Sequence, residues 1–369
     1  MNKIKKKLIS GIMKRFGIPS GMSYKFYKRI VDDFKEKDST LKERFWSYKR
    51  GFLVSTTRAF GLTPENYEHY ISDLDFYRMY PIDKQFRHWI DDKFTMKYIL
   101  SPFSDYLPKY FCAIKKGGIL TPLIDGKDIF QLDDLLDCIK RERQVALKLA
   151  SSSSGVGFYK LSFQEHFEID DKVATKDQFV DFLNTLDDYL VTEYVIAHEA
   201  IRKISSGALN TVRIMVINED AKHPKIVNSV VKFATTKSGQ VDNISAGGIY
   251  ANVNIDSGAF SNGKKFVDSF CTDCDHHPDT NLEIKGQLPN WDMMTDKIIE
   301  ISQYLSPLSY LGYDIALTEK GFKIIEINSH QGIIMLQTYY PLLKDNLASH
   351  FFIGQLQKIK RKRKGSYDE

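Results

Sequence analysis

Residues Gly312 to Asn328 read Gly-Tyr-Asp-Ile-Ala-Leu-Thr-Glu-Lys-Gly-Phe-Lys-Ile-Ile-Glu-Ile-Asn. Apolar and polar side chains alternate on either side of a short polar turn, which is the pattern of a β-hairpin. If the turn has three residues and ends with Gly321 in a G1 bulge, Asp314 lies directly opposite Glu326. A turn of even length would place these two carboxylates on opposite faces, so both registers remain open from the hairpin alone.

In the first register, one face of the hairpin carries polar chemistry. Asn328 lies two residues beyond Glu326 and points to the same face. Two carboxylates that face each other across a ladder, with Cβ atoms roughly 5 Å apart, repel unless a cation or a proton lies between them. Carboxylate and amide oxygens suit Mg²⁺, with Mn²⁺ as an alternative. We therefore predict a metal site formed by Asp314, Glu326 and Asn328; the alternative is an exposed hairpin with acids on its solvent face.

The other face of the hairpin is predicted to be core. Its residues would be Tyr313, Ile315, Leu317, Ile325 and Ile327. The composition supports a sizeable core, because 43% of the 369 residues are hydrophobic and 27% are charged, as in ordinary globular proteins.

No run approaches the roughly 20 apolar residues that span a bilayer, and the first residues lack the apolar segment and cleavage site of a signal peptide. We therefore expect a cytoplasmic protein. The four cysteines, Cys112, Cys138, Cys271 and Cys274, are expected to be free thiols. The run from Cys271 to His277 also admits zinc as a weak alternative, since structural zinc sites usually draw ligands from two separated knuckles.

The net charge of +5 is unevenly distributed. Residues 1–15 and 358–364 each carry six Lys or Arg and no acid, which leaves about −7 for the residues between them. The first segment also repeats apolar residues at helical spacing. This pattern suits a helix on the anionic inner face of a membrane, or a helix packed on its own domain. We expect no nucleic-acid partner, and the oligomeric state is open.

The periodicity along the chain predicts an α+β fold. Residues 1–110 are mostly helical in pattern, whereas short β-rich runs begin at about residue 111, with helical patterns near 174–188 and 292–305. We therefore predict an N-terminal helical region at 1–110, two lobes at 111–200 and 201–350, and a basic tail at 351–369.

A loop rich in serine and glycine, Ser151-Ser-Ser-Ser-Gly-Val-Gly157, follows the predicted strand Gln144 to Ala150. It lacks the Gly-Lys-Ser/Thr ending of a P-loop, and no clear helix follows, so neither P-loop nor Rossmann phosphate binding fits. Its backbone N–H groups and hydroxyls suit a flexible lid over nucleotide phosphates, with Lys148 supplying positive charge. The alternative is a mobile surface hairpin.

Arg213 lies in the strongly β-like run Asn210-Thr-Val-Arg-Ile-Met-Val. A buried guanidinium needs an anionic partner, which could be a phosphate, a substrate carboxylate or an internal salt bridge. Upstream, a predicted strand ending near Glu193 runs into a polar segment that could form a hinge beside an adenine ring.

Taken together, these motifs resemble the ATP-grasp superfamily, and their order along the chain is right. The runs Asn210-Thr-Val-Arg213, Asn243-Ile-Ser-Ala-Gly-Gly248, His277-Pro-Asp-Thr280 and Leu288-Pro-Asn-Trp291 are similar to the sugar-transfer-associated branch, which is tied to bacterial surface-polysaccharide and capsule biosynthesis. The resemblance covers roughly residues 85–345. It departs from the family pattern at Ser329 to Gly332, where a proline would be expected.

The resemblance implies an ATP-grasp fold, in which two α+β lobes grip ATP, together with a set of site residues. Nucleotide binding would involve Lys93, Lys148, Ser153, Ser154, Gly155, Gly157, Glu193, Tyr194, Val195, Ile196 and Glu199. Mg²⁺ would bind Asp314, Glu326 and Asn328. Catalysis would involve Lys148, Arg213 and Asn243, and substrate contacts would involve Asn210, Arg213, Gly247, Gly248 and His277.

The activity implied by the resemblance is ATP-dependent ligation of a carboxylate, such as a uronic acid, to an amine, such as an amino acid, on a small molecule or glycan. Two alternatives remain at this point. The same site could phosphorylate a sugar hydroxyl, or the protein could be a nucleotide-binding scaffold of a glycan assembly complex.

Overall fold

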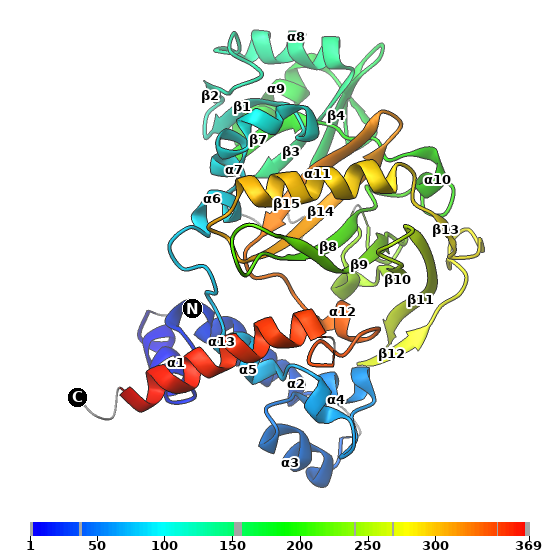
Figure 1. The fold of residues 1–369 in the computed structure, drawn as a ribbon. Helices are drawn as coiled ribbons and strands as arrows, with labels where there is room; N and C mark the ends of the chain where they lie inside the picture. Colours follow the sequence, from blue (N-terminus) through cyan, green and yellow to red (C-terminus); the bar gives the residue numbers. More distant parts are fainter. Residues whose placement is uncertain are drawn as a thin grey trace.

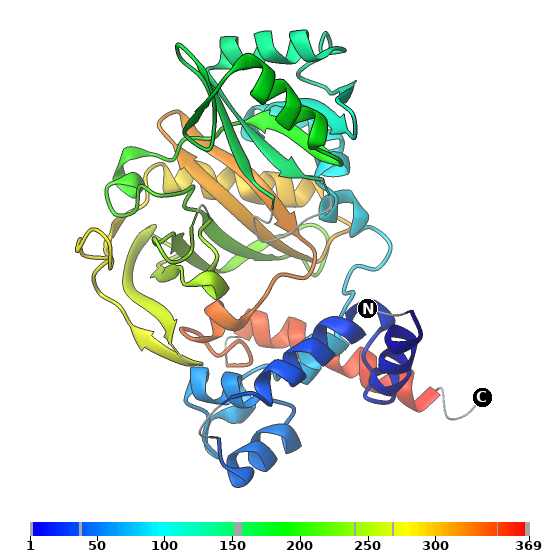
Figure 2. The ribbon, with the colours of Figure 1, turned by 180° about the vertical axis from the view of Figure 1, so that it is seen from behind.

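The computed structural model describes residues 3–36, 39–150, 157–239, 241–267, 269–344 and 346–365. Figures 1 and 2 show three parts stacked along the molecule: a small lobe, a large lobe and a helical region that contains both ends of the chain. The predicted α+β class is confirmed. Within the described ranges, no helix is long and apolar enough to cross a membrane.

The N-terminal helical region packs around its own small core. Its elements are α1 (Lys3–Arg15), α2 (Ser20–Asp33), α3 (Leu41–Lys49), α4 (Val54–Phe60), η1 (Tyr67–His69) and α5 (Asp73–Arg78). Ile9 and Met13 of α1 are buried against Phe26 and Tyr77. The remaining apolar residues of the α1 stripe, Leu8, Ile12 and Phe16, are 65%, 47% and 51% exposed. The amphipathic pattern is therefore used only in part for intramolecular packing.

The small lobe is an antiparallel sheet with two helices on its outer side (Figure 1). The strand order is β2-β1-β7-β3-β4-β5-β6. The elements are β1 (Tyr110–Lys115), β2 (Ile119–Pro122), α8 (Leu132–Glu142), β3 (Gln144–Leu149), β4 (Tyr159–Phe163), β5 (Phe167–Ile169), β6 (Lys172–Ala174), α9 (Lys176–Thr185) and β7 (Tyr189–Glu193). Leu135 and Phe179 of the two helices pack on Leu147 and Val191 of the sheet.

The large lobe contains the second antiparallel sheet, in the order β12-β11-β10-β9-β8-β14-β15, with β13 beside β11. Its strands are β8 (Val212–Ile217), β9 (Lys225–Phe233), β10 (Ile249–Val253), β11 (Ala259–Val267), β12 (Phe270–Asp273), β13 (Gly286–Gln287), β14 (Tyr310–Thr318) and β15 (Gly321–Asn328). Its helices are α6 (His88–Asp91), α7 (Lys93–Ile99), η2 (Ser101–Tyr106), α10 (Glu199–Arg202), η3 (Ile244–Ala246), α11 (Trp291–Tyr304) and α12 (Ile334–Gln337). Helix α13 (Asn346–Gly365) lies along the helical region and packs on the far face of the large sheet (Figure 1).

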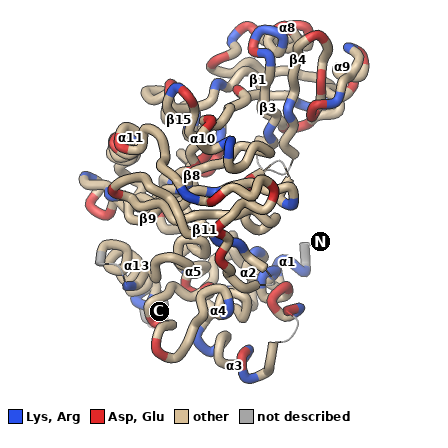
Figure 3. Tube along the Cα trace, turned by 90° about the vertical axis from the view of Figure 1, so that its right-hand side faces the viewer, with Lys and Arg blue, Asp and Glu red and all other residues tan. Residues whose placement is uncertain are grey.

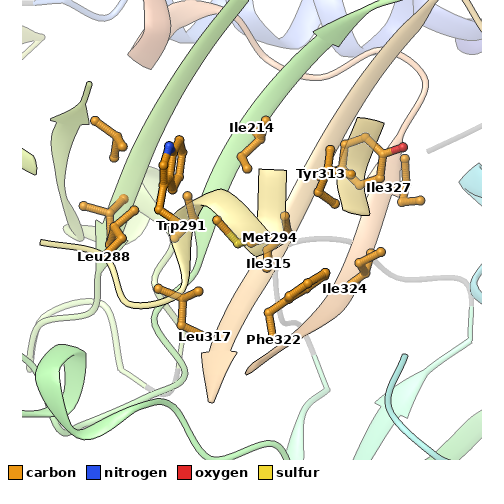
Figure 4. Packing of buried hydrophobic residues seen from close by; sticks show 14 of the residues in the cluster. Ile214, Leu288, Trp291, Met294, Tyr313, Ile315, Leu317, Phe322, Ile324 and Ile327 are labelled. Atoms are coloured by element: carbon orange, nitrogen blue, oxygen red, sulfur yellow. The ribbon is translucent and has the colours of Figure 1, made fainter. Parts of the chain in front are cut away.

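Helix α11 covers one face of the β14–β15 hairpin. Figure 4 shows Trp291 and Met294 of this helix within the same cluster as Ile315, Ile324 and Ile327 of the hairpin. All five side chains are buried, and each contributes roughly 1.5–3 kcal/mol to folding by leaving water. This packing determines which face of the hairpin is available for chemistry.

The hairpin has the predicted pairing of Asp314 with Glu326, but for a different reason. The turn contains two residues, since Thr318 pairs with Gly321, and an even turn alone would separate the two carboxylates. The register shifts by one residue between the pairs of Asp314 and Ile315, and this bulge restores the alignment. The predicted three-residue turn is therefore wrong.

The bulge also changes the assignment of one core residue. Ile325 was predicted on the core face, yet its side chain is only partly buried and lines a cavity on the opposite face. Ile324 takes its place in the core beneath α11. The extra residue of the bulge has turned this position over.

The predicted basic tail at 351–369 is helical over its described residues. Residues 346–365 form helix α13, and Phe351 and Phe352 are buried in the core on the far face of the large sheet. Figure 3 shows basic residues toward the C-terminal end of this helix. The segment is therefore part of the folded structure up to Gly365.

Helix α12 links the helical region to the large lobe. The side chain of Gln337, which is 1% exposed, accepts a hydrogen bond from the Ile71 N–H at 2.8 Å and donates one to the Ile71 carbonyl at 3.2 Å. Ser269 donates to Glu36 at 2.7 Å on the other side of the same junction. The helical region is thus held firmly against the lobe.

Replacing Gln337 with alanine should destabilise this junction. Both backbone groups of Ile71 would remain buried without partners, so we expect Gln337→Ala to lower the free energy of unfolding by about 1–3 kcal/mol. Urea denaturation measures this change, and Gln357→Ala, on the exposed face of α13, is the matched control. Equal stability of both variants would contradict the proposed link.

Candidate active site

A cavity of about 1080 Å³ is lined by residues of both lobes and of the helical region. It brings together most of the predicted site residues from distant parts of the sequence. Those that line it are Lys93, Lys148, Glu193, Tyr194, Val195, Arg213, Asn243, Gly247, Asp314, Glu326 and Asn328.

The centre of the cavity wall is a row of three charged residues on adjacent strands. Asp314 on β14 pairs with Arg213 on β8 and with Glu326 on β15. The Arg213 guanidinium donates to both Asp314 carboxylate oxygens, at 2.7 and 2.6 Å, and the Lys232 Nζ lies 3.1 Å from Oδ1. The sequence left three possible anionic partners for Arg213, and the structure shows the internal salt bridge.

The two carboxylates of this row are in opposite electrostatic situations. Burial opposes ionisation of Asp314, but the charges of Arg213 and Lys232 outweigh it and lower the pKa of Asp314 to about 2. Burial and the charge of Asp314 raise the pKa of Glu326. The ionised form of Glu326 is thus destabilised, and a further cation would stabilise it.

The donor set at this position fits a divalent ion. Asp314, Glu326 and Asn328 offer only oxygen, which is what Mg²⁺ prefers, and two carboxylates leave room for phosphate and water ligands. Among the described residues there is no cluster of three or more His, Cys, Asp or Glu side chains placed to hold a metal. The protein therefore offers a partial shell, and the metal role of these residues remains a prediction.

Two lysines approach the carboxylates from the other side of the cavity. Lys148 lies on β3 of the small lobe, and Lys93 begins α7. Burial and the positive charge of Lys93 lower the pKa of Lys148 to about 8, although Glu326 and Glu193 act in the opposite direction. Two cations held this close together in a cavity favour a polyanionic ligand such as a triphosphate.

The predicted adenine hinge reaches the cavity only in part. Glu193, Tyr194 and Val195 line it, and Glu193 accepts a hydrogen bond from the Lys109 N–H at 3.0 Å. Ile196 is 48% exposed and Glu199 pairs with Lys203 at 3.1 Å, and neither is among the lining residues. The structure does not bring these two residues to the site.

The Asn243–Gly248 run forms a second wall. Asn243 caps η3 by accepting hydrogen bonds from the Ser245 N–H and hydroxyl, and Gly247 borders the cavity. Gly248 lies behind them, where a Cβ atom would come within 3.0 Å of the Asn243 carbonyl oxygen. Its role is close backbone packing.

Two predicted substrate residues are engaged elsewhere. The Asn210 amide donates to the Ser205 carbonyl at 2.7 Å and accepts from the Ala234 N–H at 2.8 Å. His277 is 1% exposed; its Nε2 lies 2.8 Å from the Ala234 carbonyl oxygen, and its Nδ1 accepts from the Asp279 N–H. Both residues hold backbone segments in place and do not line the main cavity.

Ser153, Ser154 and Gly155 lie outside the described residues, so the predicted phosphate lid stays a prediction. Gly157 has a φ of +72° and leads into β4. A Cβ atom there would meet Leu149 and Tyr189 within 2.8 Å, which explains the glycine by packing.

The cysteines are free thiols, as predicted. Cys274 is buried and its Sγ contacts the His276 carbonyl oxygen at 3.3 Å. Because the described part of the chain shows no metal-binding cluster around these residues, nothing supports the zinc alternative.

Sequence reasoning missed Lys232 and Lys160, which also line the cavity. Lys232 lies near the end of β9 and contacts both Asp242, at 3.4 Å, and Asp314. A lysine within the apolar run Val230-Val231-Lys232-Phe233 was the available signal. Lys160 of β4 lies over the Tyr194 ring, 5.4 Å from its centroid.

Comparison with known proteins places this arrangement in context. A family model described as sugar-transfer associated ATP-grasp matches residues 73–347. No curated protein matches the chain.

Several solved structures resemble the chain distantly. D-alanine–D-alanine ligase from Bacillus anthracis, complexed with ATP, is 14% identical with a TM-score of 0.36, over 75% of this chain and 69% of that protein. D-alanyl-alanine synthetase A from Vibrio cholerae is 13% identical with a TM-score of 0.42, over 74% and 65%. N5-carboxyaminoimidazole ribonucleotide synthetase from Thermotoga maritima is 11% identical with a TM-score of 0.36, over 70% and 50%.

Replacing Lys148 with methionine should stabilise the protein at neutral pH while weakening nucleotide binding. The folded pKa of Lys148, about 8, lies below the usual 10.5, so the burial penalty of its charge is present below pH 8 and disappears as pH rises toward 10.5. We expect the variant to gain on the order of 1–3 kcal/mol at pH 7, with the gain shrinking between pH 8 and 10.

Thermal unfolding at a series of pH values, together with ADP titration, tests this expectation. Lys84→Met, at an exposed lysine outside the cavity, is the control. If the Lys148→Met protein is less stable than wild type at pH 7, the buried charge of Lys148 does not destabilise the folded protein.

Proposed function

Since the chain belongs to the sugar-transfer-associated ATP-grasp family, we propose that it is an ATP- and Mg²⁺-dependent ligase that joins a carboxylate to an amine. The substrate carboxylate attacks the γ-phosphorus of ATP, the bond to the β-phosphate oxygen breaks, and ADP and an acyl phosphate form. The amine then attacks the acyl carbon, inorganic phosphate leaves with the electron pair of the broken C–O bond, and the amine loses a proton as the amide forms.

The observation that carries this proposal is the charged row Arg213–Asp314–Glu326 within one cavity that also contains Lys93 and Lys148. Phosphoryl transfer spreads negative charge over equatorial oxygens, and its catalysis depends mainly on positioning and charge neutralisation. Asp314, Glu326 and Asn328 would hold Mg²⁺, which supplies Lewis acidity at the phosphates when bound.

The remaining residues act through their own charges. Lys148 and Lys93 would bind phosphate oxygens from the small-lobe side of the cavity. Arg213 is fixed by two hydrogen bonds to Asp314, so it would present its remaining N–H groups without further loss of side-chain entropy. Asn243 and Gly247 would border the acyl group from the opposite wall.

For the substrates, we propose a uronic acid of a surface polysaccharide or its precursor as the acyl donor and an amino acid as the amine. The family description supports a connection with sugars. Product analysis separates ligation from the kinase alternative: ligation releases ADP and phosphate and yields an amide, whereas a kinase yields ADP and a phosphorylated sugar. Release of ADP without free phosphate or amide would overturn the ligase proposal.

Replacing Glu326 with glutamine should abolish turnover without harming the fold. Asp314 is a poorer test because its removal would leave Arg213 and Lys232 without their buried partner. Burial and repulsion by Asp314 raise the pKa of Glu326, so a neutral amide there removes an unfavourable charge. We expect a loss of at least about 100-fold in kcat with Mg²⁺ present, and an unchanged or higher Tm without metal.

ADP release coupled to phosphate detection measures the effect, with Glu165→Gln, at an exposed glutamate of the small lobe, as the matched control. EDTA should reduce wild-type turnover to the level of Glu326→Gln, and added Mg²⁺ should restore only the wild type. Full activity of Glu326→Gln would exclude the role assigned to this carboxylate.

A further inference from the structure

The helical region forms a wall of the cavity that the ligase chemistry described above does not use. Lys25 and Arg29 of α2, Ser55 of α4, and Phe76 and Tyr77 of α5 line it. Lys25, Arg29 and Ser55 lie outside the residues 73–347 that match the family. This wall therefore lies partly outside the range that the family model matches, because only Phe76 and Tyr77 fall within it.

Arg29 is held in place on this wall by a buried carboxylate. Its guanidinium lies 3.4 Å from Asp73, whose side chain is 3% exposed, whereas the Arg29 side chain is 32% exposed. Asp73 also accepts hydrogen bonds from the Leu53 N–H at 2.9 Å and the Thr56 hydroxyl at 3.0 Å. The carboxylate is thus engaged from the protein side, while the guanidinium, which also interacts with the Tyr77 hydroxyl, lines the cavity.

Lys25 adds a second positive charge. It lies one helical turn before Arg29 on α2, so both side chains leave the same face of the helix. Its side chain is exposed, and no ion pair of Lys25 is formed within the described ranges. Among the charged cavity residues that the helical region contributes, two are basic and one, Asp73, is acidic and already engaged. This part of the cavity therefore attracts anions.

His330 provides an independent sign of a missing ligand. Its ring stacks on Phe76, with 4.2 Å between the centroids, and lines the cavity. Both ring nitrogens are buried, and neither makes a hydrogen bond of ordinary geometry among the described residues, although the Phe76 backbone lies close enough to interact with the ring. A neutral imidazole ring offers one donor and one acceptor. Buried polar groups without partners are rare in native proteins.

His330 also connects this wall to the reaction centre. It follows the predicted metal residue Asn328 by two residues, and Gln331 to Met335 continue along the cavity toward α12. Because Gln337 of α12 is hydrogen-bonded to the Ile71 backbone, the helical region that carries the wall is joined to the lobe that carries the charged row. A molecule that contacts His330 therefore lies beside the phosphoryl-transfer site.

We propose that Lys25, Arg29 and His330 form a subsite for an anionic group of the substrate, placed apart from the reacting carboxylate or amine. Arg29 binds a carboxylate or phosphate through its fork of N–H donors, Lys25 adds a point charge, and the His330 ring borders the bound group. The inference rests on the proposed ligase function. It adds that one substrate carries a second negative charge, and that the N-terminal helices select it.

The same anion could come from either substrate. A sugar acid could bring a phosphate at its anomeric carbon, and an amino acid could bring its own α-carboxylate. Two probe pairs distinguish these sources: D-glucuronic acid 1-phosphate against D-glucuronic acid, and L-alanine against L-alaninamide. Within each pair, only the first compound carries the additional anion.

Calorimetric titration of each probe into full-length protein saturated with Mg²⁺ and a non-hydrolysable ATP analogue tests the subsite without requiring turnover. We expect the anionic member of one pair to bind at least about tenfold more tightly than its partner, and Lys25→Gln and Arg29→Lys each to reduce that preference by roughly tenfold or more. Arg29→Lys keeps the charge opposite Asp73, so folding is preserved while the fork geometry is lost.

Lys28→Gln is the matched control, because Lys28 lies on the same helix and does not line the cavity. It should bind both probe pairs like the wild type. Absence of any preference in the wild type, or an equal preference in Lys25→Gln and Lys28→Gln, would overturn the subsite. A preference that depends on Lys25 in a protein that forms no amide would sustain the subsite and reject the ligase function.

Discussion

The charge of Asp314 is the constraint around which the rest of the structure is arranged. This carboxylate is almost fully buried in the middle of a sheet, where an isolated charge would cost several kcal/mol. Arg213 and Lys232, from two neighbouring strands, compensate it with three contacts of 3.1 Å or less. The order of strands β9, β8, β14 and β15 is therefore also an order of charges, and the last of them, on Glu326, is opposed by burial and by the charge of Asp314.

Two kinds of support keep this row in position. On one face, α11 buries the apolar side of the hairpin, so the charged side faces the cavity. On the other face, the small lobe brings Lys148 within the influence of Glu326, and the helical region closes the far end through Gln337 and Ile71. The cavity is thus formed by three parts of the chain that are each anchored elsewhere.

Much of this could be predicted from the sequence, because strand periodicity and motif order are local properties. The resemblance to the ATP-grasp family is confirmed by the family match, and β3, β7, β8, β14 and β15 lie where the alternating runs placed them. The predicted turn length was wrong because no residue type in the run Lys-Ile-Ile-Glu marks the position of the bulge. Long-range partnerships were also inaccessible: nothing local shows that residue 29 meets residue 73, that Lys232 meets Asp314, or that His277 turns toward the Ala234 backbone.

The bulge beside Ile325 has a consequence for how such hairpins can be compared. A two-residue turn with one bulge and a three-residue turn without one give the same alignment at the open end of the ladder. Whether the turn has an odd or an even number of residues therefore does not decide whether the two carboxylates share a face, provided that one bulge lies between the turn and the carboxylates. Two chains whose turns differ by one residue, with one bulge to compensate, can hence carry superimposable acidic pairs at the same separation in sequence, and an alignment that opens a gap beside Glu326 would misplace that carboxylate.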